Sequence, residues 1–298
     1  MNGSQIFQNN LIISSKLIIL GEMMMEAELK EDIYIAINIW SNLLIEMFQE
    51  EIEYIYAKGS AIKTWETKID YVPQISDIDI HVKVKEHVSG LLNNPDLKTS
   101  IALSTEYRKR FKKYNIDQKR TPFHLPRIQL VILNKLVEKK FTFVHSRLQD
   151  VRVLFGNPIF PQELDHESIR QLDKSELLKL HTPLKKIPTD MLDRSDQFEY
   201  YTALRRITYV ISPSPVRLLT QLLRDKNPYD IWTWNRTTIL QQLQSLSLHE
   251  LATTYEQYYL MGWELFNSKF EDIEKFQNTI SLGLQVLSLV YNNVLTLR

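Results

Sequence analysis

The chain has 298 residues, of which 44% are hydrophobic and 24% are charged, and its 36 basic side chains balance 36 acidic ones. These values are typical of a soluble globular protein with room for two domains, so we do not expect a disordered chain. The neutral balance argues against a protein that binds nucleic acid through its overall charge. The absence of cysteine excludes disulfides, thiolate metal sites and cysteine nucleophiles, and it agrees with the cytoplasmic location that we expect.

The N-terminal segment carries an apolar stretch at residues 11–20, which is interrupted by two serines and a lysine. It is too short to span a bilayer and follows no basic segment, so we expect neither a membrane anchor nor a signal peptide. We interpret residues 1–25 as a loosely attached extension. Apolar residues then recur at helical spacing, which predicts an amphipathic helix from Glu26 to Glu51.

Two strands with a tight turn between them are predicted next. Residues alternate in character over Ile52–Lys58, which predicts the first strand. Gly59 and Ser60 end this strand, and we expect them to open a short helix that runs to about Lys68. A loop then leads into a second predicted strand, Ile75–Val84.

The second strand has two chemically distinct faces, because side chains alternate along a strand with period two. The apolar residues of one face are Ile78, Ile80, Val82 and Val84, and the polar residues of the other are Asp77, Asp79, His81 and Lys83. We expect the apolar face to pack on a core and the polar face, with His81, to be exposed.

The rest of the chain changes from mixed structure to helices alone. Residues 86–120 are predicted to be helical, and two further strands are predicted at Arg127–Leu133 and Val151–Phe155. After Pro161 only helices are expected, at residues 165–181, 196–212, 214–225, 235–246, 248–268 and 271–297. The predicted fold is therefore α+β, with a small mixed sheet and flanking helices at residues 26–160 and an all-helical domain at 161–298.

Asp77 and Asp79 are the candidate metal ligands. The two residues are two positions apart on one face of a strand, so their Cα atoms should lie about 6.6 Å apart. At this distance both carboxylates can reach one ion. Oxygen ligands of this kind suit Mg²⁺ or Mn²⁺, which proteins often hold with one or two carboxylates and the phosphates of a substrate. Gly59 lets the backbone approach a ligand closely, and Ser60 offers a hydroxyl and an N–H to a phosphate.

These motifs together resemble the signature of the DNA polymerase β-like nucleotidyltransferase superfamily. The resemblance rests on a strand that ends in Gly59-Ser60, followed by Asp77-Ile78-Asp79-Ile80, and it covers residues 50–160. Val153-Leu154-Phe155-Gly156 is similar to the closing strand of such domains, and the helical half resembles their C-terminal domains more loosely. The resemblance implies that Gly59 and Ser60 hold a triphosphate and that Asp77 and Asp79 bind the metal.

One position departs from the family pattern. The resemblance implies a third carboxylate on a neighbouring strand, but the matching position here is Gln129, which cannot take a proton and is a weak metal ligand. Asp150 and Asp70 are alternative candidates for the general base. Arg127 shares the face of Gln129, and both are candidates for contacting the nucleotide.

The sequence leaves three functions open. The first is a metal-dependent nucleotidyltransferase that moves an NMP from an NTP, such as ATP, to a small molecule, a protein or an RNA. The second, favoured by Gln129, is a non-catalytic nucleotide-binding or regulatory protein, and the third is a structural scaffold. The basic residues at 107–120 suit a nucleic acid, but we favour a solvated helix face, and tryptophans near Arg236 are weaker candidates for stacking on a base.

Overall fold

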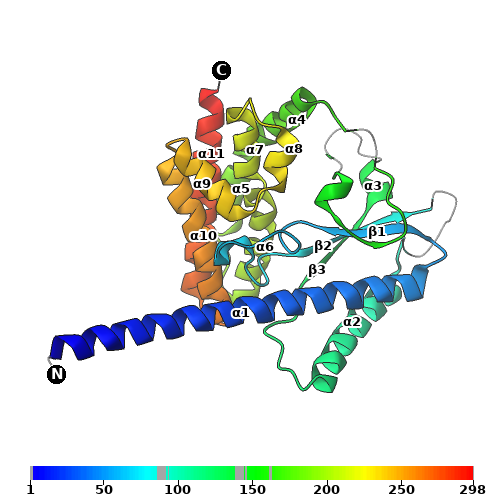
Figure 1. Cartoon of the computed structure of the whole chain (residues 1–298). Coiled ribbons are helices and arrows are strands. Elements are labelled where there is room, and N and C mark those ends of the chain that lie inside the picture. The colour runs from blue at the N-terminus through cyan, green and yellow to red at the C-terminus, as the bar shows by residue number, and fades with distance from the viewer. Residues whose placement is uncertain are drawn as a thin grey trace.

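The computed structural model describes residues 3–85, 92, 94–137, 144, 146–160 and 163–297, and the side chains of all of these except 3–24, 136 and 137. It is an α+β fold, with a mixed sheet, flanking helices and a helical region toward the C-terminus (Figure 1). The fold class predicted from the sequence is therefore confirmed. Among the described residues, no helix has both the length and the apolar character needed to cross a membrane.

The described residues form one four-stranded sheet with the strand order β3-β2-β1-β4. Its strands are β1 (Ile52–Lys58), β2 (Ile78–Val84), β3 (Ile128–Ile132) and β4 (Arg152–Phe155). Strand β1 pairs antiparallel with β2 and β4, whereas β2 and β3 are parallel. All four strands were predicted, although β2 begins three residues later than expected, so that Asp77 lies just before the strand.

The register places three polar residues in one row across the sheet. Lys58 at the end of β1 pairs with Asp79 of β2, and Asp79 pairs with Gln129 of β3. In the next row Tyr56 pairs with His81. Because paired residues in neighbouring strands share a face, the candidate metal ligand Asp79 has a cation on one side and an amide on the other.

The opposite face of the sheet belongs to the main core. Ile78, Ile80 and Val82 are fully buried there, as the alternation along β2 predicted. They share this core with Ile33 and Ile37 of the first helix, α1 (Gly3–Phe48). Helix α2 (Leu97–Asp117) packs beside α1 (Figure 1), where Trp40 and Tyr107 meet edge to face at 5.2 Å between ring centroids.

The first helix is longer than the sequence predicted. Helix α1 extends over Gly3–Phe48, whereas we expected it to begin at Glu26, and its N-terminal end projects away from the rest of the ribbon in Figure 1. Helix α2 begins at Leu97, with the Asp96 side chain accepting from the Thr99 N–H at 2.6 Å. Residues 86–91 and 93, which were also predicted to be helical, lie outside the described residues.

The C-terminal region contains the six predicted helices and two that the sequence did not reveal. The predicted helices are α4 (His166–Leu178), α6 (Gln197–Ile211), α7 (Ser214–Leu222), α9 (Arg236–Ser245), α10 (His249–Asn267) and α11 (Ile273–Thr296). The unpredicted ones are α5 (His181–Asp190) and α8 (Pro228–Thr233), and a short α3 (Leu133–Val137) also follows β3. Asn235 is the N-cap of α9 as predicted, since its side chain accepts from Thr238 N–H at 2.7 Å.

Candidate active site

A cavity of about 1130 Å³ lies between the polar face of the sheet and the helical region. The strand residues Lys58, Asp79 and Gln129 line one side of it. Arg205 of α6 and Arg236 of α9 line the other side. The cavity is large enough for a cofactor-sized ligand, because such sites usually measure about 300–1,000 Å³.

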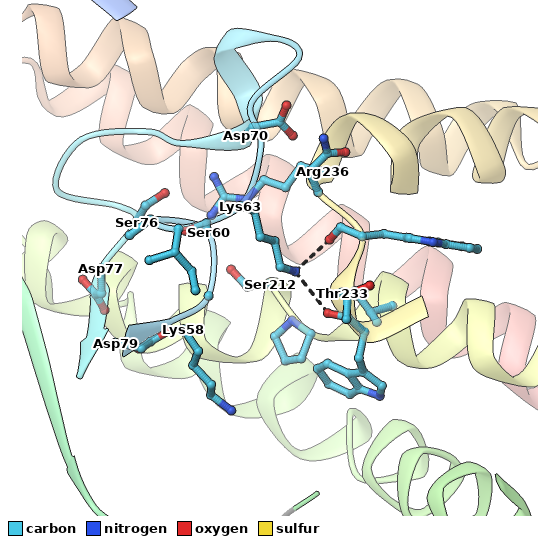
Figure 2. Close-up of a pocket in the computed structure, with 18 of the residues that line it drawn as sticks. Lys58, Ser60, Lys63, Asp70, Ser76, Asp77, Asp79, Ser212, Thr233 and Arg236 are labelled. Atoms are coloured by element: carbon cyan, nitrogen blue, oxygen red, sulfur yellow. Dashed lines mark hydrogen bonds between the residues drawn. The ribbon is translucent and has the colours of Figure 1, made fainter. Parts of the chain in front are cut away.

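Gly59, Asp77 and Asp79 line the sheet side of this cavity, as the sequence predicted. Figure 2 shows the two aspartates there. Gly59 has a positive φ of 86°, which side chains rarely tolerate. A Cβ at this position would lie 2.5 Å from Oδ2 of Asp79. Glycine is therefore needed here both for the backbone conformation and for the close approach of the Asp79 carboxylate.

Gly59→Ala is expected to destabilise the fold by about 1–3 kcal/mol and to displace the Asp79 carboxylate. The added methyl group meets the carboxylate oxygen, so binding of any ligand that depends on Asp79 should be lost as well. Urea denaturation measures the first effect, and Mn²⁺ binding in the presence of ATP measures the second.

Gly156→Ala is the matched control for this prediction. Gly156 also has a positive φ, 69°, and its added Cβ would lie 2.3 Å from the Glu53 carbonyl oxygen, away from the carboxylates. Both variants should lose stability, but only Gly59→Ala should lose ligand binding. Equal ligand binding by the two variants would contradict the role assigned to Gly59.

The segment after Gly59 differs from the prediction. We expected a helix from Ser60 to Lys68, but residues 60–62 form a turn, and the only helical turn before β2 is the 3₁₀ segment η1 (Lys68–Asp70) in these described residues. The Trp65 indole donates to the Ser60 carbonyl at 2.8 Å, which folds the segment back on itself. Ser60 lines the cavity, but it has no helix N-terminus behind it to attract a phosphate.

Cationic side chains line the cavity near this turn. Burial lowers the pKa of Lys63 to about 8, an effect strengthened by the nearby charges of Arg236 and Lys58. Its Nζ donates to the carbonyls of Trp232 and Trp234 at 3.1 and 2.8 Å, so it joins the turn to α8 (Figure 2). Partial burial also lowers the pKa of Lys58, while Asp79 opposes that shift.

The two candidate metal ligands have different surroundings. Burial raises the pKa of Asp79 to about 6, although the Lys58 ammonium opposes this. Burial also raises the pKa of Asp77, and the Arg127 guanidinium opposes it. Asp77 forms ion pairs with Arg127 and with Arg205, whose Nη2 lies 2.8 and 3.0 Å from the two carboxylate oxygens.

Gln129 lies between the two carboxylates. With its amide nitrogen turned toward them, it donates to Asp77 Oδ2 and Asp79 Oδ1, each at 3.2 Å. The structure thus brings together five residues predicted for the site, Gly59, Ser60, Asp77, Asp79 and Gln129. Arg127, also predicted to contact the nucleotide, pairs with Asp77 and is not among the residues that line the cavity. As a donor to both carboxylates, the Gln129 amide reduces the repulsion between them. It cannot take a proton, so it cannot act as a general base.

No family model, curated protein or solved structure matches this chain. The chemistry of the site therefore has to be argued from its own residues.

The donor set of the site can be compared with the needs of a divalent cation. No group of three or more His, Cys, Asp or Glu side chains is gathered for a metal within the described residues. Asp77 and Asp79 nevertheless supply hard carboxylate oxygens, and Mg²⁺ is often held by one or two carboxylates together with substrate phosphates. The residues fit a cation that arrives with a phosphate ligand, provided that the guanidinium groups on Asp77 give way.

Three other predictions need correction or comment. His81 was expected to be exposed, but it is buried under Tyr56, with stacked rings at 5.0 Å, and burial lowers its pKa to about 2. Asp70, a candidate base, is buried and its oxygens accept four hydrogen bonds. Asp150, the other candidate, lines the cavity but pairs with Arg147 at 2.5 Å. Both carboxylates are therefore engaged by other groups of the protein.

The candidate site residues that the sequence did not reveal are Lys63, Arg205 and Tyr209. All three line the cavity, and the Tyr209 hydroxyl accepts from Arg205 and Arg127. The sequence holds one indication of a role for Arg205, which is its place among the apolar residues of α6. An arginine on a buried helix face needs polar partners, because an unpaired buried charge is costly. Arg236, noted in the sequence beside two tryptophans, packs its guanidinium over the Tyr259 ring at 4.0 Å.

The basic segment at 107–120 is partly engaged in contacts within the fold. Tyr107 and Phe111 are buried, and Arg110 pairs with Glu46 and Glu106. At the end of the segment, Arg120 pairs with two acidic residues of α1. Arg108, Lys112 and Lys113 of the same segment are exposed, so the solvated helix face stays a prediction, and binding of nucleic acid there is not tested by these contacts.

Proposed function

We propose that this chain is a metal-dependent nucleotidyltransferase, which binds an NTP in the cavity and transfers its NMP to an acceptor. The observation that carries the proposal is the contact of Gly59 with Asp79, next to Asp77, at the wall of a cavity of about 1130 Å³. These are the residues on which the resemblance to polymerase β-like nucleotidyltransferases rests. The proposal includes a cytoplasmic location, which suits a chain without cysteine.

Each residue of the site has a role in this proposal. The turn at Gly59-Ser60 brings the backbone close to the triphosphate, and Lys58 and Lys63 offset its negative charge. Asp77 and Asp79 would hold Mg²⁺ or Mn²⁺, which would neutralise charge on the phosphates as the NMP is transferred. Catalysis of such transfers depends mainly on positioning and charge neutralisation, so a site with cations and carboxylates around one cavity suits it.

The acceptor would enter from the side of the helical region. The walls there include Tyr209 of α6, Trp232 of α8 and Trp234, the residue that follows α8. Aromatic surfaces of this kind suit an acceptor with a ring or an apolar part. A small molecule, a protein hydroxyl and an RNA end all remain candidate acceptors, because this type of scaffold serves many substrates.

A second candidate function is nucleotide binding without catalysis. It is favoured by Gln129, which donates to both carboxylates where the family resemblance implies a carboxylate. A regulatory protein of this kind would bind an NTP through the same cations but would not release pyrophosphate.

The test is NTP-dependent release of pyrophosphate with Mg²⁺ or Mn²⁺ across a pool of acceptors, with NTP binding measured by calorimetry. The wild type should release pyrophosphate. The Asp77→Ala/Asp79→Ala double variant should release it at least about a hundredfold more slowly. Binding without release in the wild type would favour the regulatory function. Neither binding nor release would contradict both proposals and leave a structural scaffold.

A further inference from the structure

Asp77 is held by two arginines that come from different parts of the chain. Arg205 lies on α6 in the helical region, and its Nη2 contacts both oxygens of the Asp77 carboxylate. Arg127 lies just before β3 and pairs with Asp77 Oδ2. Tyr209, one turn after Arg205 on α6, accepts from both guanidinium groups at 3.4 and 3.3 Å. The carboxylate is thus enclosed by two cations and a hydroxyl.

Arg205 also fixes the loop that leads to Asp77. Its Nη1 donates to the carbonyls of Gln74 and Ile75, each at 2.8 Å, and Gln74 has a positive φ of 65°. Arg205 is only 8% exposed, so this arrangement lies deep in the wall of the cavity. One arginine of the helical region therefore determines where the first candidate metal ligand lies.

This arrangement opposes a bare cation and favours an anion. A divalent cation at Asp77 would have to approach two guanidinium groups and displace at least one of them from the carboxylate. The Nε–H groups of Arg127 and Arg205 are buried and have no hydrogen-bond partner within the described part of the chain. Arg205 lines the cavity and Arg127 shares its partner Asp77, so both guanidinium groups can turn unused donors to phosphate oxygens, which guanidinium binds with paired hydrogen bonds.

We propose that Arg205 and Arg127 act as a gate on metal binding, in which they hold Asp77 until an NTP arrives and then move to its phosphates. Asp77 is released to the cation only by this exchange, so that cation and nucleotide bind together. This inference rests on the proposed function, since it assigns an order of binding to the same site. It makes Arg205 a nucleotide-binding residue contributed by the helical region.

The experiment measures Mn²⁺ binding to the full-length chain by electron paramagnetic resonance, without nucleotide and with a non-hydrolysable ATP analogue. Wild type should bind Mn²⁺ weakly alone and much more tightly with the analogue. Arg205→Gln should bind Mn²⁺ alone roughly tenfold more tightly than wild type, because a charged competitor for Asp77 is gone. The same variant should bind the analogue less tightly, so that the effect of nucleotide on Mn²⁺ affinity shrinks.

Two further variants separate this effect from damage to the fold. Arg170→Gln is the matched control, because Arg170 is equally buried and donates to the carbonyls of Leu223 and Lys226, away from Asp77. It should leave Mn²⁺ affinity unchanged. Tyr209→Phe removes the hydroxyl that orients both arginines and keeps their charge, so it should tighten Mn²⁺ binding by a smaller factor.

The outcomes distinguish this inference from the proposed function. If wild type binds Mn²⁺ with the analogue but Arg205→Gln binds Mn²⁺ alone no more tightly than wild type, the gate is wrong and the proposed function stands. Equal tightening by Arg170→Gln would also overturn the gate. If wild type binds neither the analogue nor Mn²⁺, the proposed function fails and the gate with it.

Discussion

Asp79→Asn is expected to raise the free energy of unfolding at pH 7 by roughly 2–3 kcal/mol while it removes NTP-dependent pyrophosphate release. Burial raises the pKa of Asp79 from 3.8 to about 6, so the folded chain carries an ionised carboxylate that its surroundings disfavour. Asparagine has nearly the same shape and no charge. The variant should therefore be more stable and inactive, which is the behaviour of a residue kept for its chemistry rather than for the fold.

The difference in stability between wild type and Asp79→Asn should depend on pH, and the raised pKa of Asp79 gives the direction. Between about pH 4 and pH 6 the folded chain holds a proton on Asp79 that the unfolded chain has lost. Wild-type stability therefore falls as the pH rises through this window, relative to Asp79→Asn, and the difference is constant above it. Urea denaturation of both proteins at a series of pH values measures the difference. The idea fails if the two proteins have parallel stability curves from pH 4 to pH 7.

Asp96→Asn is the control, because the pKa of Asp96 is shifted in the direction opposite to that of Asp79. Asp96 is an exposed N-cap, and hydrogen bonds from Thr99 lower the pKa of its carboxyl. A lowered pKa means that the charge stabilises the fold above the ordinary pKa and that this stabilisation is lost as the pH falls. Asparagine is also a good N-cap, so only the effect of the charge is removed. Asp96→Asn should therefore show no gain in stability at pH 7.

The sheet and most helices were predictable because their signals are local. The extent of β1 is the same in the sequence prediction and in the structure, Ile52–Lys58, because alternation and the following glycine mark both of its ends. The alternation along β2 placed Ile78, Ile80 and Val82 in the core. In the helical region, Asn235 marked the start of α9 through its own hydrogen bond. Each of these features depends on residues a few positions apart.

The failures have specific physical reasons. Helix α5 contains a proline at position 188 and α8 has only six residues, so neither has the length or periodicity from which a helix is recognised. The expected helix at Ser60 is replaced by a turn, because Trp65 donates to the Ser60 carbonyl and the segment contains several residues of low helix propensity. His81 follows the alternation of β2, but Tyr56 covers the polar face at that point.

The candidate site was predictable only in its sheet half. Gly59, Asp77 and Asp79 lie within about twenty residues of one another, and strand geometry is enough to bring them together. Arg205 is 128 residues from Asp77 in the sequence, and no local pattern places it on that carboxylate. The same holds for Asp70, whose partners at the start of α9 are 167 residues away. Tertiary contacts therefore decide which carboxylates are available for chemistry.

Asp70→Ala is expected to lower the free energy of unfolding by about 3 kcal/mol or more. The Asp70 carboxylate accepts from the backbone N–H groups of Glu66, Thr67 and Thr237 and from the Thr237 hydroxyl, at 2.7–3.1 Å. Alanine leaves the three backbone N–H groups without this acceptor and removes the link between η1 and the N-terminus of α9. Urea denaturation at pH 7 measures the loss.

Asp150→Ala is the matched control, since Asp150 is the other acidic residue that the sequence suggested as a base. Its partner Arg147 keeps a second carboxylate, Asp230, at 2.9 Å, so this variant should lose less than about 1 kcal/mol. A loss of stability by Asp70→Ala no greater than that of Asp150→Ala would show that the Asp70 contacts do not hold the loop to α9. A large loss assigns Asp70 to the joint between the sheet and the helical region.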